Sequence, residues 1–494
     1  MAGGQEMSAL ADRATGLGMN QMNLETVLEM LRGGAGLRTH SGAVTPGDVF
    51  VALSGTRVDG ARFIDDAVAR GARVVVHAIG VDAGNLEGVA CLAVQSPAQT
   101  LGVLARTAFG TQSRLPRIIG VTGTNGKTTT AHLIHFLLSH NGMTTGLIGT
   151  VHCSWPGAQV PATMTTPDCL SLHGIIGRMV SDGVENLVME VSSHALDQER
   201  TAGLPMEVGV FTNLTQDHLD YHGDMQRYFE AKARLFLDGP ARCARGLVNV
   251  DDEYGRRLKE MRPDLLGFGL DSNDAELRCR IAAAGPQGMI LGLSHGGDEW
   301  ELRTGLVGRH NAYNLLSAVG AGLLLGLAPA QCDCLSKAPG APGRLERVPN
   351  ERDLSIFIDY AHTPDALEKV SVALKSMGFK RLVTVFGCGG DRDAGKRPLM
   401  GEAVARHADV AVVTSDNPRT EDPDSIIDQI VPGLASARQV LREVDRRKAI
   451  ALAVASMQPG DALLIAGKGH EDYQIIGTEK RHFSDFEVVR ECLS

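Results

Sequence analysis

The glycine- and threonine-rich stretch Gly120–Thr130 has the residue types of a loop that binds nucleotide phosphates. It follows the apolar run 117–121, which predicts a buried strand, and it precedes 131–140, whose apolar stripe predicts a helix. Glycines let backbone N–H groups turn toward an anion, and the start of the helix adds partial positive charge. We therefore predict a nucleotide site, with Lys127 at the outer phosphates and Thr128 at a magnesium ion.

The spacing of this loop departs from the usual G-x-x-x-x-G-K-[S/T] pattern. Gly126 and Lys127 keep its second half, but Val121 stands where the pattern has its first glycine, and the other glycines are Gly120 and Gly123. A turn that binds nothing is the alternative. The lysine, the hydroxyl groups and the strand–loop–helix context favour nucleotide binding.

Two more apolar runs in the central part of the chain end in polar residues. Runs 186–191 and 207–212 predict strands of a parallel sheet, in which ligands bind beyond the carboxyl ends. Glu190 lies at the end of the first run, and its oxygens suit Mg²⁺ near a triphosphate, whereas the alternative is a solvated charge. His218 follows the second run, and its alternative role is structural hydrogen bonding.

The last third of the chain repeats one arrangement four times. Apolar runs alternate with helix patterns and predict a second doubly wound sheet, with strands at 355–359, 381–386, 409–414 and 461–466. Each run leads into a polar loop: Asp359–Pro364, Gly387–Arg392, Asp416–Arg419 and Gly467–Glu471. Because the carboxyl ends of parallel strands meet at one edge of a sheet, we expect these loops to converge on one crevice.

The chain of 494 residues is long enough for about three domains. Strands at 48–53 and 73–77, with a helix at 63–70 between them, indicate a first α/β domain. We predict an α/β protein with an N-terminal domain, a central P-loop-type domain with a parallel sheet, and a C-terminal Rossmann-like domain. The boundaries are placed at 1–113, 114–338 and 339–494.

The composition of the chain indicates which partners and which cellular compartment to expect. A formal net charge of −10 argues against a nucleic-acid partner, whose phosphates would be repelled. Nine scattered cysteines indicate reduced thiols and a cytoplasmic protein. Residues 1–20 have no apolar core, so we expect no secretory signal there. The uncharged, glycine-rich stretch 311–332 predicts a buried helix and no membrane insertion, because its dense apolar part is shorter than the roughly 20 residues that a bilayer needs.

With these motifs placed, the chain resembles the Mur ligase family, which are ATP-dependent amide-bond synthetases of cell-wall assembly. The resemblance covers nearly the whole length, and the stretches that carry it are Thr122–Thr129, Glu190–His194, Asn213–Gly223, Gly308–Ala312, Gly343–Arg344, Asp359–His362 and Gly467–Glu471. It implies that ATP phosphorylates a carboxylate of UDP-N-acetylmuramoyl-L-alanyl-D-glutamate and that an amine then displaces phosphate. It also implies a monomer.

The stretch Asp416–Arg419 resembles the family's diaminopimelate-selecting motif, which implies meso-diaminopimelate as the second substrate. A guanidinium fork suits the extra carboxylate of that amino acid, and lysine would leave the fork unpaired. Asp416 and Glu471 could receive the distal ammonium, and Arg392 is a second candidate for a carboxylate. The implied contacts are Arg392, Asp416, Asn417, Pro418, Arg419, Gly467 and Glu471.

The same resemblance implies the ATP contacts. These are Gly123, Thr124, Asn125, Gly126, Lys127, Thr128, Thr129, Asn311, Arg344 and Asp359. The implied catalytic residues are Lys127, Glu190, His218 and Lys232, with Mg²⁺ held by Thr128, Glu190, His218 and Lys232. Lys232 matches the family's carbamylated lysine, a change that turns a cation into an oxygen ligand. The alternative is a helix-surface lysine in an ion pair.

The UDP-muramoyl dipeptide is expected at a third set of residues. The resemblance implies Ser41, Thr165, Thr166, Ser192, Gln198 and Arg200. At the uridine end this chain has His40-Ser41-Gly42 where relatives commonly have Asp-Ser-Arg, so only the serine is retained. Residues 56–58 are a further candidate for uridine contact.

Three other functions remain open at this point. A folate-polyglutamylating ligase shares the style of the ATP loop, although Asp416–Arg419 speaks against it. A non-catalytic nucleotide-binding or assembly protein is disfavoured by Lys127, Glu190, Lys232 and the four polar loops. A lysine-adding member of the same family would differ at Asp416–Arg419. No Ser-His-Asp arrangement is required, so we do not interpret Ser193 and His194 as a hydrolase pair.

Overall fold

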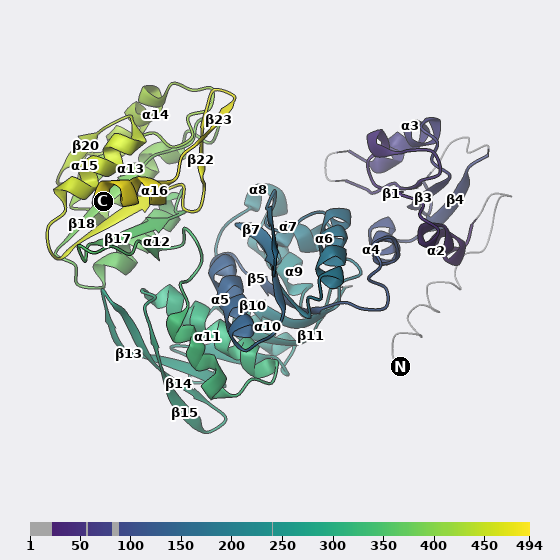
Figure 1. The fold of residues 1–494 in the computed structure, drawn as a ribbon, viewed down its shortest axis with the longest axis horizontal. Coiled ribbons are helices and arrows are strands. Elements are labelled where there is room, and N and C mark those ends of the chain that lie inside the picture. The colour runs from purple at the N-terminus through teal and green to yellow at the C-terminus, as the bar shows by residue number, and fades with distance from the viewer. Residues whose placement is uncertain (1–21, 56–57, 82–87, 240) are drawn as a thin grey trace. The chain divides into compact units, whose positions relative to one another are not determined.

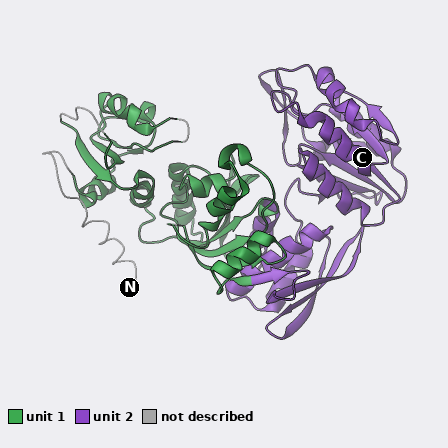
Figure 2. Ribbon diagram, turned by 180° about the vertical axis from the view of Figure 1, so that it is seen from behind, with its two compact units in different colours: residues 1–127, 141–266 green, residues 128–140, 267–494 purple. Residues whose placement is uncertain are grey.

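The computed structural model describes residues 22–55, 58–81, 88–239 and 241–494 (Figure 1). It falls into two compact units, which Figure 2 colours separately. Unit 1 holds residues 1–127 and 141–266, and unit 2 holds residues 128–140 and 267–494. The division of the chain into three domains stays a prediction, and the expected lack of a secretory signal in 1–20 lies outside the described residues.

Unit 1 begins with a small parallel sheet, as the first strand and helix patterns predicted. Its strands follow the order β1-β2-β3-β4. The elements are α2 (Leu24–Arg32), β1 (Leu37–Arg38), η1 (Ser41–Ala43), β2 (Val49–Val51), η2 (Gly60–Phe63), α3 (Ile64–Ala69), β3 (Val74–Ala78), β4 (Ala90–Val94) and α4 (Pro97–Ala108). Val49 and Val51 pack with residues of α2 and α4, while Phe50 packs with α3 on the opposite face. This alternation lets a three-residue strand bury both faces.

The larger part of unit 1 is a second sheet, in the order β11-β10-β5-β9-β6-β7-β8. Strands β5, β6, β9, β10 and β11 are parallel, and β7 and β8 add an antiparallel extension. The bounds are β5 (Arg117–Thr122), β6 (Thr145–Ile148), β7 (His152–Trp155), β8 (Ala158–Pro161), α6 (Cys169–Ser181), β9 (Asn186–Glu190), α7 (Ser193–Asp197), β10 (Met206–Phe211), α8 (Leu219–His222), α9 (Met225–Ala233), β11 (Cys243–Asn249) and α10 (Glu253–Met261). The three predicted strands are confirmed as β5, β9 and β10.

Unit 2 opens with strands and helices that the sequence only partly predicted. Its elements are α5 (Lys127–His140, of which 128–140 belong here), β12 (Leu266–Gly269, beginning at the last residue of unit 1), β13 (Leu277–Gly285), β14 (Gly288–His295), β15 (Asp298–Thr304), α11 (Arg309–Leu324) and η3 (Pro329–Lys337). Strands β13, β14 and β15 form an antiparallel meander. Helix α11 is almost entirely buried, as predicted for this stretch. No helix within the described ranges has the length and apolar content that crossing a membrane requires.

The C-terminal part of unit 2 is the predicted doubly wound sheet, in the order β16-β17-β21-β18-β19-β20. Its bounds are β16 (Glu346–Arg347), β17 (Ser355–Asp359), α12 (Pro364–Lys375), β18 (Arg381–Phe386), α13 (Lys396–His407), β19 (Val410–Val413), α14 (Pro423–Ile430), η4 (Val431–Leu434), β20 (Val440–Arg442), α15 (Arg446–Ser456), β21 (Asp461–Ala466), β22 (Tyr473–Ile476), β23 (Glu479–His482) and α16 (Asp485–Leu493). Strands β17, β21, β18 and β19 are the four predicted runs. The hairpin of β22 and β23 was not predicted.

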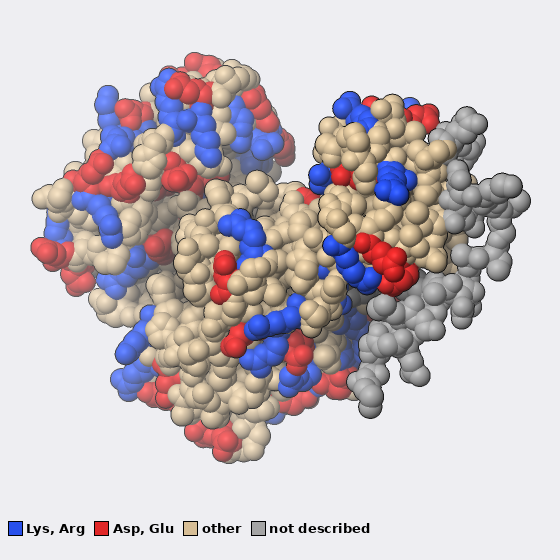
Figure 3. Space-filling view, turned by 45° about the vertical axis from the view of Figure 1, so that its right-hand side comes forward, with Lys and Arg blue, Asp and Glu red and all other residues tan. Residues whose placement is uncertain are grey.

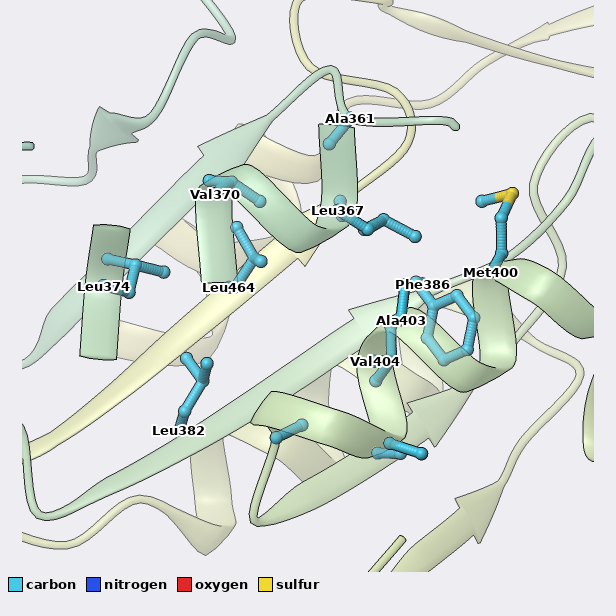
Figure 4. Packing of buried hydrophobic residues seen from close by; sticks show 14 of the residues in the cluster. Ala361, Leu367, Val370, Leu374, Leu382, Phe386, Met400, Ala403, Val404 and Leu464 are labelled. Carbon is cyan, nitrogen blue, oxygen red and sulfur yellow. The ribbon is translucent and has the colours of Figure 1, made fainter. Parts of the chain in front are cut away.

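Alternate residues of these strands bury opposite faces of the sheet. Leu464 and Phe386 pack with α12, α13 and α14, and Figure 4 shows Leu367, Val370 and Leu374 of α12 in this cluster. Residues between them, such as Ile465, pack with α15 and α16. Because helices cover both faces, the strands are continuous apolar runs, which is why they stand out in the sequence.

The surface charge of the molecule is mixed. In the view of Figure 3, Lys and Arg side chains alternate with Asp and Glu side chains, and neither sign covers a continuous area. Nucleic-acid-binding proteins usually carry a continuous basic patch. The face shown has no such patch.

Candidate phosphate-loop and amino-acid sites

The glycine-rich loop after β5 is held in place by contacts with the loop after β10. Gly123 has φ +147°, and a side chain there would collide with the hydroxyl of Thr212. The Thr124 N–H donates to the Asn213 carbonyl (2.9 Å), and the Asn125 N–H donates to the Asn213 side-chain oxygen (3.0 Å). The loop after β10 therefore fixes the loop after β5. This contact explains why position 123 needs a glycine.

Two lysines donate to one carbonyl oxygen in this loop. Lys127 Nζ lies 2.9 Å from the oxygen of Gly123 and 2.8 Å from that of Thr124, and Lys232 Nζ lies 2.8 Å from the oxygen of Gly123. The loop thus gathers two cations where the sequence predicts phosphates. An anion between or beside them would relieve their repulsion.

Lys232 of α9 is buried, with a relative exposure of 1%, so the alternative of a helix-surface lysine is wrong. Burial lowers its pKa well below the usual lysine value, and the neighbouring charge of Lys127 lowers it further. The aromatic ring of Tyr228, one helical turn earlier, lies 4.8 Å from Nζ. A lysine with a lowered pKa holds a larger fraction of neutral amine, which is the form that reacts with carbon dioxide.

Glu190 is also buried, with a relative exposure of 1%, so the alternative of a solvated charge is wrong. Its carboxylate accepts hydrogen bonds from the Thr150 N–H (2.7 Å) and the Thr150 hydroxyl (3.2 Å). Thr150 follows the carboxyl end of β6, and Glu190 ends β9. Two neighbouring strands therefore bring these groups together at the expected edge of the sheet.

His218 lies at the start of α8 with a left-handed backbone, φ +52°. Its ring is 4.9 Å from the ring of His194, and its side chain is 47% exposed. Burial lowers the pKa of His218, while Asp217 opposes that shift. The neutral imidazole is therefore favoured, and this is the form that binds metals.

Ser193 and His194 do not form a pair. The Ser193 hydroxyl instead lies 2.9 Å from Nε2 of His222, and Ser193 is buried, with 1% exposure. A hydroxyl that substrate cannot reach is not a nucleophile. The prediction that this pair is no hydrolase site is consistent with these contacts.

Five of the six residues predicted to hold the muramoyl dipeptide, all except Ser41, lie in hydrogen-bonded contacts next to Glu190. The Thr166 hydroxyl donates to the Glu190 carbonyl (2.9 Å) and accepts from the Ser192 N–H (3.0 Å). Arg200 donates to the Thr166 carbonyl (2.9 Å) and to the Gln198 side chain (3.0 Å). The hydroxyl of Thr165, the remaining predicted contact, lies 3.1 Å from that of Thr150.

The predicted uridine end is only partly described. Ser41 begins the short helix η1 and is buried. A hydrogen bond from its hydroxyl lowers the pKa of Asp66, and a hydrogen bond from Arg70 lowers it further. Thr56 and Arg57 lie outside the described residues, and Val58 is exposed.

Unit 2 carries five predicted ATP contacts: Thr128 and Thr129, both buried in α5, and three residues farther along the chain. Asn311 is buried in α11, where its amide donates to the Val307 carbonyl (2.8 Å). The Asp359 carboxylate accepts from the backbone N–H groups of Leu345 (2.6 Å) and Ala361 (2.7 Å), and burial raises its pKa. Arg344 lies with its guanidinium 4.6 Å from the ring of Tyr360.

The four polar loops of the C-terminal sheet converge, as predicted. Gly467 donates to the Asp359 carbonyl (3.1 Å), and Arg419 Nη1 donates to the Gly390 carbonyl (2.7 Å). The Asn417 amide donates to the Glu471 carboxylate (3.0 Å). Each loop is thus bonded directly to another, so the four loops meet at one edge of the sheet.

The charged groups of these loops keep capacity for a ligand. Apart from Nη1, the guanidinium of Arg419 makes no hydrogen bond to the described residues, and the Asp416 carboxylate accepts none from them. Asp416 and Asn417 are buried, whereas Arg392 is exposed. Pro418 and Gly467 contribute shape, since a side chain at Gly467 would crowd the Asp416 carboxylate.

Lys468 and Thr150 are contacts that the motif analysis missed. Lys468 has no exposed surface and donates to the Asn417 side chain. Its position between two loop glycines, three residues before Glu471, was the available signal. For Thr150, the signal was a hydroxyl directly after an apolar run.

Comparisons with known proteins agree with this arrangement. Residues 35–108 match the Mur ligase family catalytic domain, 121–322 the Mur ligase middle domain, and 343–469 the Mur ligase glutamate ligase domain. A UDP-N-acetylmuramoyl-L-alanyl-D-glutamate–2,6-diaminopimelate ligase from Lawsonia intracellularis is 50% identical over 454 residues, which cover 91% of this chain and 94% of the relative. The chain belongs to the Mur ligase family. The predicted family is thereby confirmed.

Solved structures show the same relationship. A UDP-N-acetylmuramoyl-L-alanyl-D-glutamate–2,6-diaminopimelate ligase is 34% identical, with a TM-score of 0.70 over 93% of this chain and 94% of that chain. The folylpolyglutamate synthase of Mycobacterium tuberculosis has a TM-score of 0.61 and 22% identity, over 75% of this chain and 93% of that one. At that identity the likeness shows a shared fold alone.

Proposed function

We propose that this protein uses ATP to join meso-diaminopimelate to UDP-N-acetylmuramoyl-L-alanyl-D-glutamate in the synthesis of peptidoglycan precursors. The relatives named for that reaction support the proposal. The observation that carries it is the meeting of four loops at which the Arg419 fork and the Asp416 carboxylate keep hydrogen-bonding capacity for a ligand. This pairing matches an amino acid that ends in both a carboxylate and an ammonium.

ATP activates the acceptor carboxylate. A carboxylate is a poor acyl donor because its leaving group would be oxide, so the γ-phosphoryl group of ATP is transferred to it and gives an acyl phosphate and ADP. Lys127 and the loop N–H groups offset the negative charge that builds up during this transfer. The amine of diaminopimelate then attacks the acyl carbon, and phosphate leaves.

Magnesium is part of the proposal. Glu190, His218 and the hydroxyl of Thr128 would hold it, and bound Mg²⁺ would neutralise phosphate charge. Unmodified Lys232 would repel the ion, whereas a carbamate on its nitrogen would add an oxygen ligand. Within the described ranges, no three His, Cys, Asp or Glu side chains form a metal site of their own. The proposed site therefore adds the Thr128 hydroxyl, the carbamate and phosphate oxygens to Glu190 and His218.

The remaining assignments follow the sequence prediction. ATP contacts at Gly123–Thr129, Asn311, Arg344 and Asp359, and dipeptide contacts at Ser41, Thr165, Thr166, Ser192, Gln198 and Arg200, are proposals of the same kind. We place the enzyme in the cytoplasm as a monomer. In this structure the side chain of Asn311 supports the start of α11, so its role would be to shape the site.

The proposal is tested by phosphate release from ATP with the UDP-muramoyl dipeptide present and one amino acid added at a time. We expect release with meso-diaminopimelate and much slower release with L-lysine. Equal rates would contradict the assigned amino acid, and no release with either would contradict the reaction. Lys127→Ala should abolish substrate-dependent formation of ADP, and near-normal ADP formation would refute its role.

A further inference from the structure

The buried ammonium of Lys468 lies between the loop after β19 and the segment that leads into β22. Lys468 is the second residue of the loop after β21, and its side chain has no exposed surface. Its Nζ lies 3.1 Å from the Asn417 side-chain oxygen, 2.6 Å from the Tyr473 carbonyl oxygen and 3.6 Å from a carboxylate oxygen of Glu471. The ammonium therefore donates two hydrogen bonds, to Asn417 and to Tyr473, and forms an ion pair with Glu471. These contacts hold the buried lysine in place.

That arrangement fixes the orientation of Asn417. Its side-chain oxygen accepts from Lys468 and from the Ile475 N–H (2.9 Å), while its amide nitrogen donates to Glu471 (3.0 Å). Turning the amide over would place NH₂ against two donors and oxygen against a carboxylate. Lys468, together with the Ile475 N–H, therefore favours the orientation in which Asn417 presents its NH₂ group to Glu471.

Hydrogen bonds next to Lys468, Asn417 and Glu471 also connect two segments that carry proposed substrate contacts. The Arg419 N–H donates to the Ile475 carbonyl (3.1 Å), and the Gln474 side chain donates to the Asp416 carbonyl (2.7 Å). Segment 467–476 is thereby hydrogen-bonded to segment 416–419, and the Lys468 ammonium contacts both segments. Removing this cation would leave the Glu471 carboxylate without its ionic partner.

A fully buried ion pair, Arg446 with Asp485, lies at the end of β21, next to the loop that carries Lys468. Arg446 donates to both carboxylate oxygens of Asp485 (2.8 and 2.7 Å) and to the Ala466 carbonyl (2.9 Å), which ends β21 two residues before Lys468. Both members of the pair have 0% exposed side chains. The ion pair therefore holds the backbone at Ala466, where the loop with Lys468 begins.

We propose that Lys468 is a positioning residue for the amino-acid substrate. It acts through Asn417 and Glu471 and has no role in the formation of the acyl phosphate. The inference rests on the proposed function, because it assumes that Glu471 faces the substrate's ammonium. It names a requirement for amino-acid binding that is separate from the requirement for Arg419.

The test compares Lys468→Met with Lys480→Met in the full-length enzyme. Lys480 is an exposed lysine of β23 whose Nζ lies 3.6 Å from the ring of Tyr473, so its removal controls for loss of a nearby cation. For Lys468→Met we expect the KM for diaminopimelate to rise at least tenfold. The KM values for ATP and for the UDP-muramoyl dipeptide should stay within twofold, as should trapping of the acyl phosphate by hydroxylamine without the amino acid. Lys480→Met should leave all four values unchanged.

A double-mutant cycle separates positioning from general structural damage. If Lys468 acts through Glu471, adding Lys468→Met to Glu471→Gln should raise the KM for diaminopimelate much less than it does in the wild type. If Lys468→Met does not fold, Lys468→Gln, which keeps an amide donor, takes its place in both measurements. Unchanged amino-acid KM, independent effects in the cycle, or an equal rise in all three KM values would overturn the proposal. Failure of the wild-type enzyme to use diaminopimelate would instead refute the proposed function.

Discussion

The two lysines that share the Gly123 carbonyl lead to a prediction about carbon dioxide. Their nitrogens lie 2.9 Å and 2.8 Å from one oxygen. The nitrogens are thus at most about 6 Å apart, and when both are protonated they repel by about 3 kcal/mol at an effective dielectric constant of about 20. A carbamate on Lys232 would replace this repulsion with an attraction to Lys127.

We therefore expect enzyme that is prepared and assayed without carbon dioxide to lose turnover by about a hundredfold, the rate factor that corresponds to about 3 kcal/mol. Bicarbonate should restore it. Carbon dioxide adds to the neutral amine, and burial together with Lys127 lowers the pKa of unmodified Lys232. The neutral fraction rises as the pH rises through that lowered pKa, so reactivation should be faster at mildly alkaline than at mildly acidic pH.

The assay is phosphate release after degassing, with and without added bicarbonate. Lys232→Met is the control and should be nearly inactive and insensitive to bicarbonate. Electron density at the tip of Lys232 should show three additional atoms in active enzyme. Full turnover without carbon dioxide, or a bare amine in crystals of active enzyme, would refute the reasoning.

Three further outcomes follow from single contacts. Arg419→Lys keeps the charge but loses the fork, and should reduce the preference for diaminopimelate over lysine by about 10- to 100-fold, measured as the ratio of kcat/KM values; an unchanged ratio would argue against this contact. Gly123→Ala should abolish ATP binding in calorimetry, since a side chain there collides with the loop's own support; normal affinity would contradict the loop geometry. Arg446→Met should lower the free energy of unfolding by about 3–5 kcal/mol because Asp485 is left buried and unpaired, whereas Arg447→Met, which breaks an exposed pair, should change it by less than about 1 kcal/mol. Equal denaturant midpoints for these two variants would contradict that account.

Local patterns predicted most of the fold. The loop at Gly123–Lys127 and the four C-terminal runs were visible because glycine, lysine and continuous apolar segments are signals within a few residues. The meander β13–β15 was missed although Leu277 and Cys279 alternate with Arg278 and Arg280, the expected pattern of a strand with one wet face. That signal was present in the sequence and was overlooked.

Contacts between distant residues were harder to predict. Nothing near Lys232 shows that its nitrogen reaches Gly123, which is 109 residues away in the chain. Burial of Glu190 and Lys468 is likewise a tertiary property, because a charged residue after an apolar run has the same sequence signature whether it is solvated or enclosed. The motifs therefore gave candidates, and packing decided which alternatives were wrong.

The central claim is that ATP activates the acceptor carboxylate before the amine attacks. It is tested most directly with UDP-N-acetylmuramoyl-L-alanyl-D-glutamate carrying ¹⁸O in the γ-carboxylate, incubated with ATP and meso-diaminopimelate. The account predicts one ¹⁸O atom in each released phosphate molecule for each amide formed. Amide product accompanied by unlabelled phosphate would contradict it.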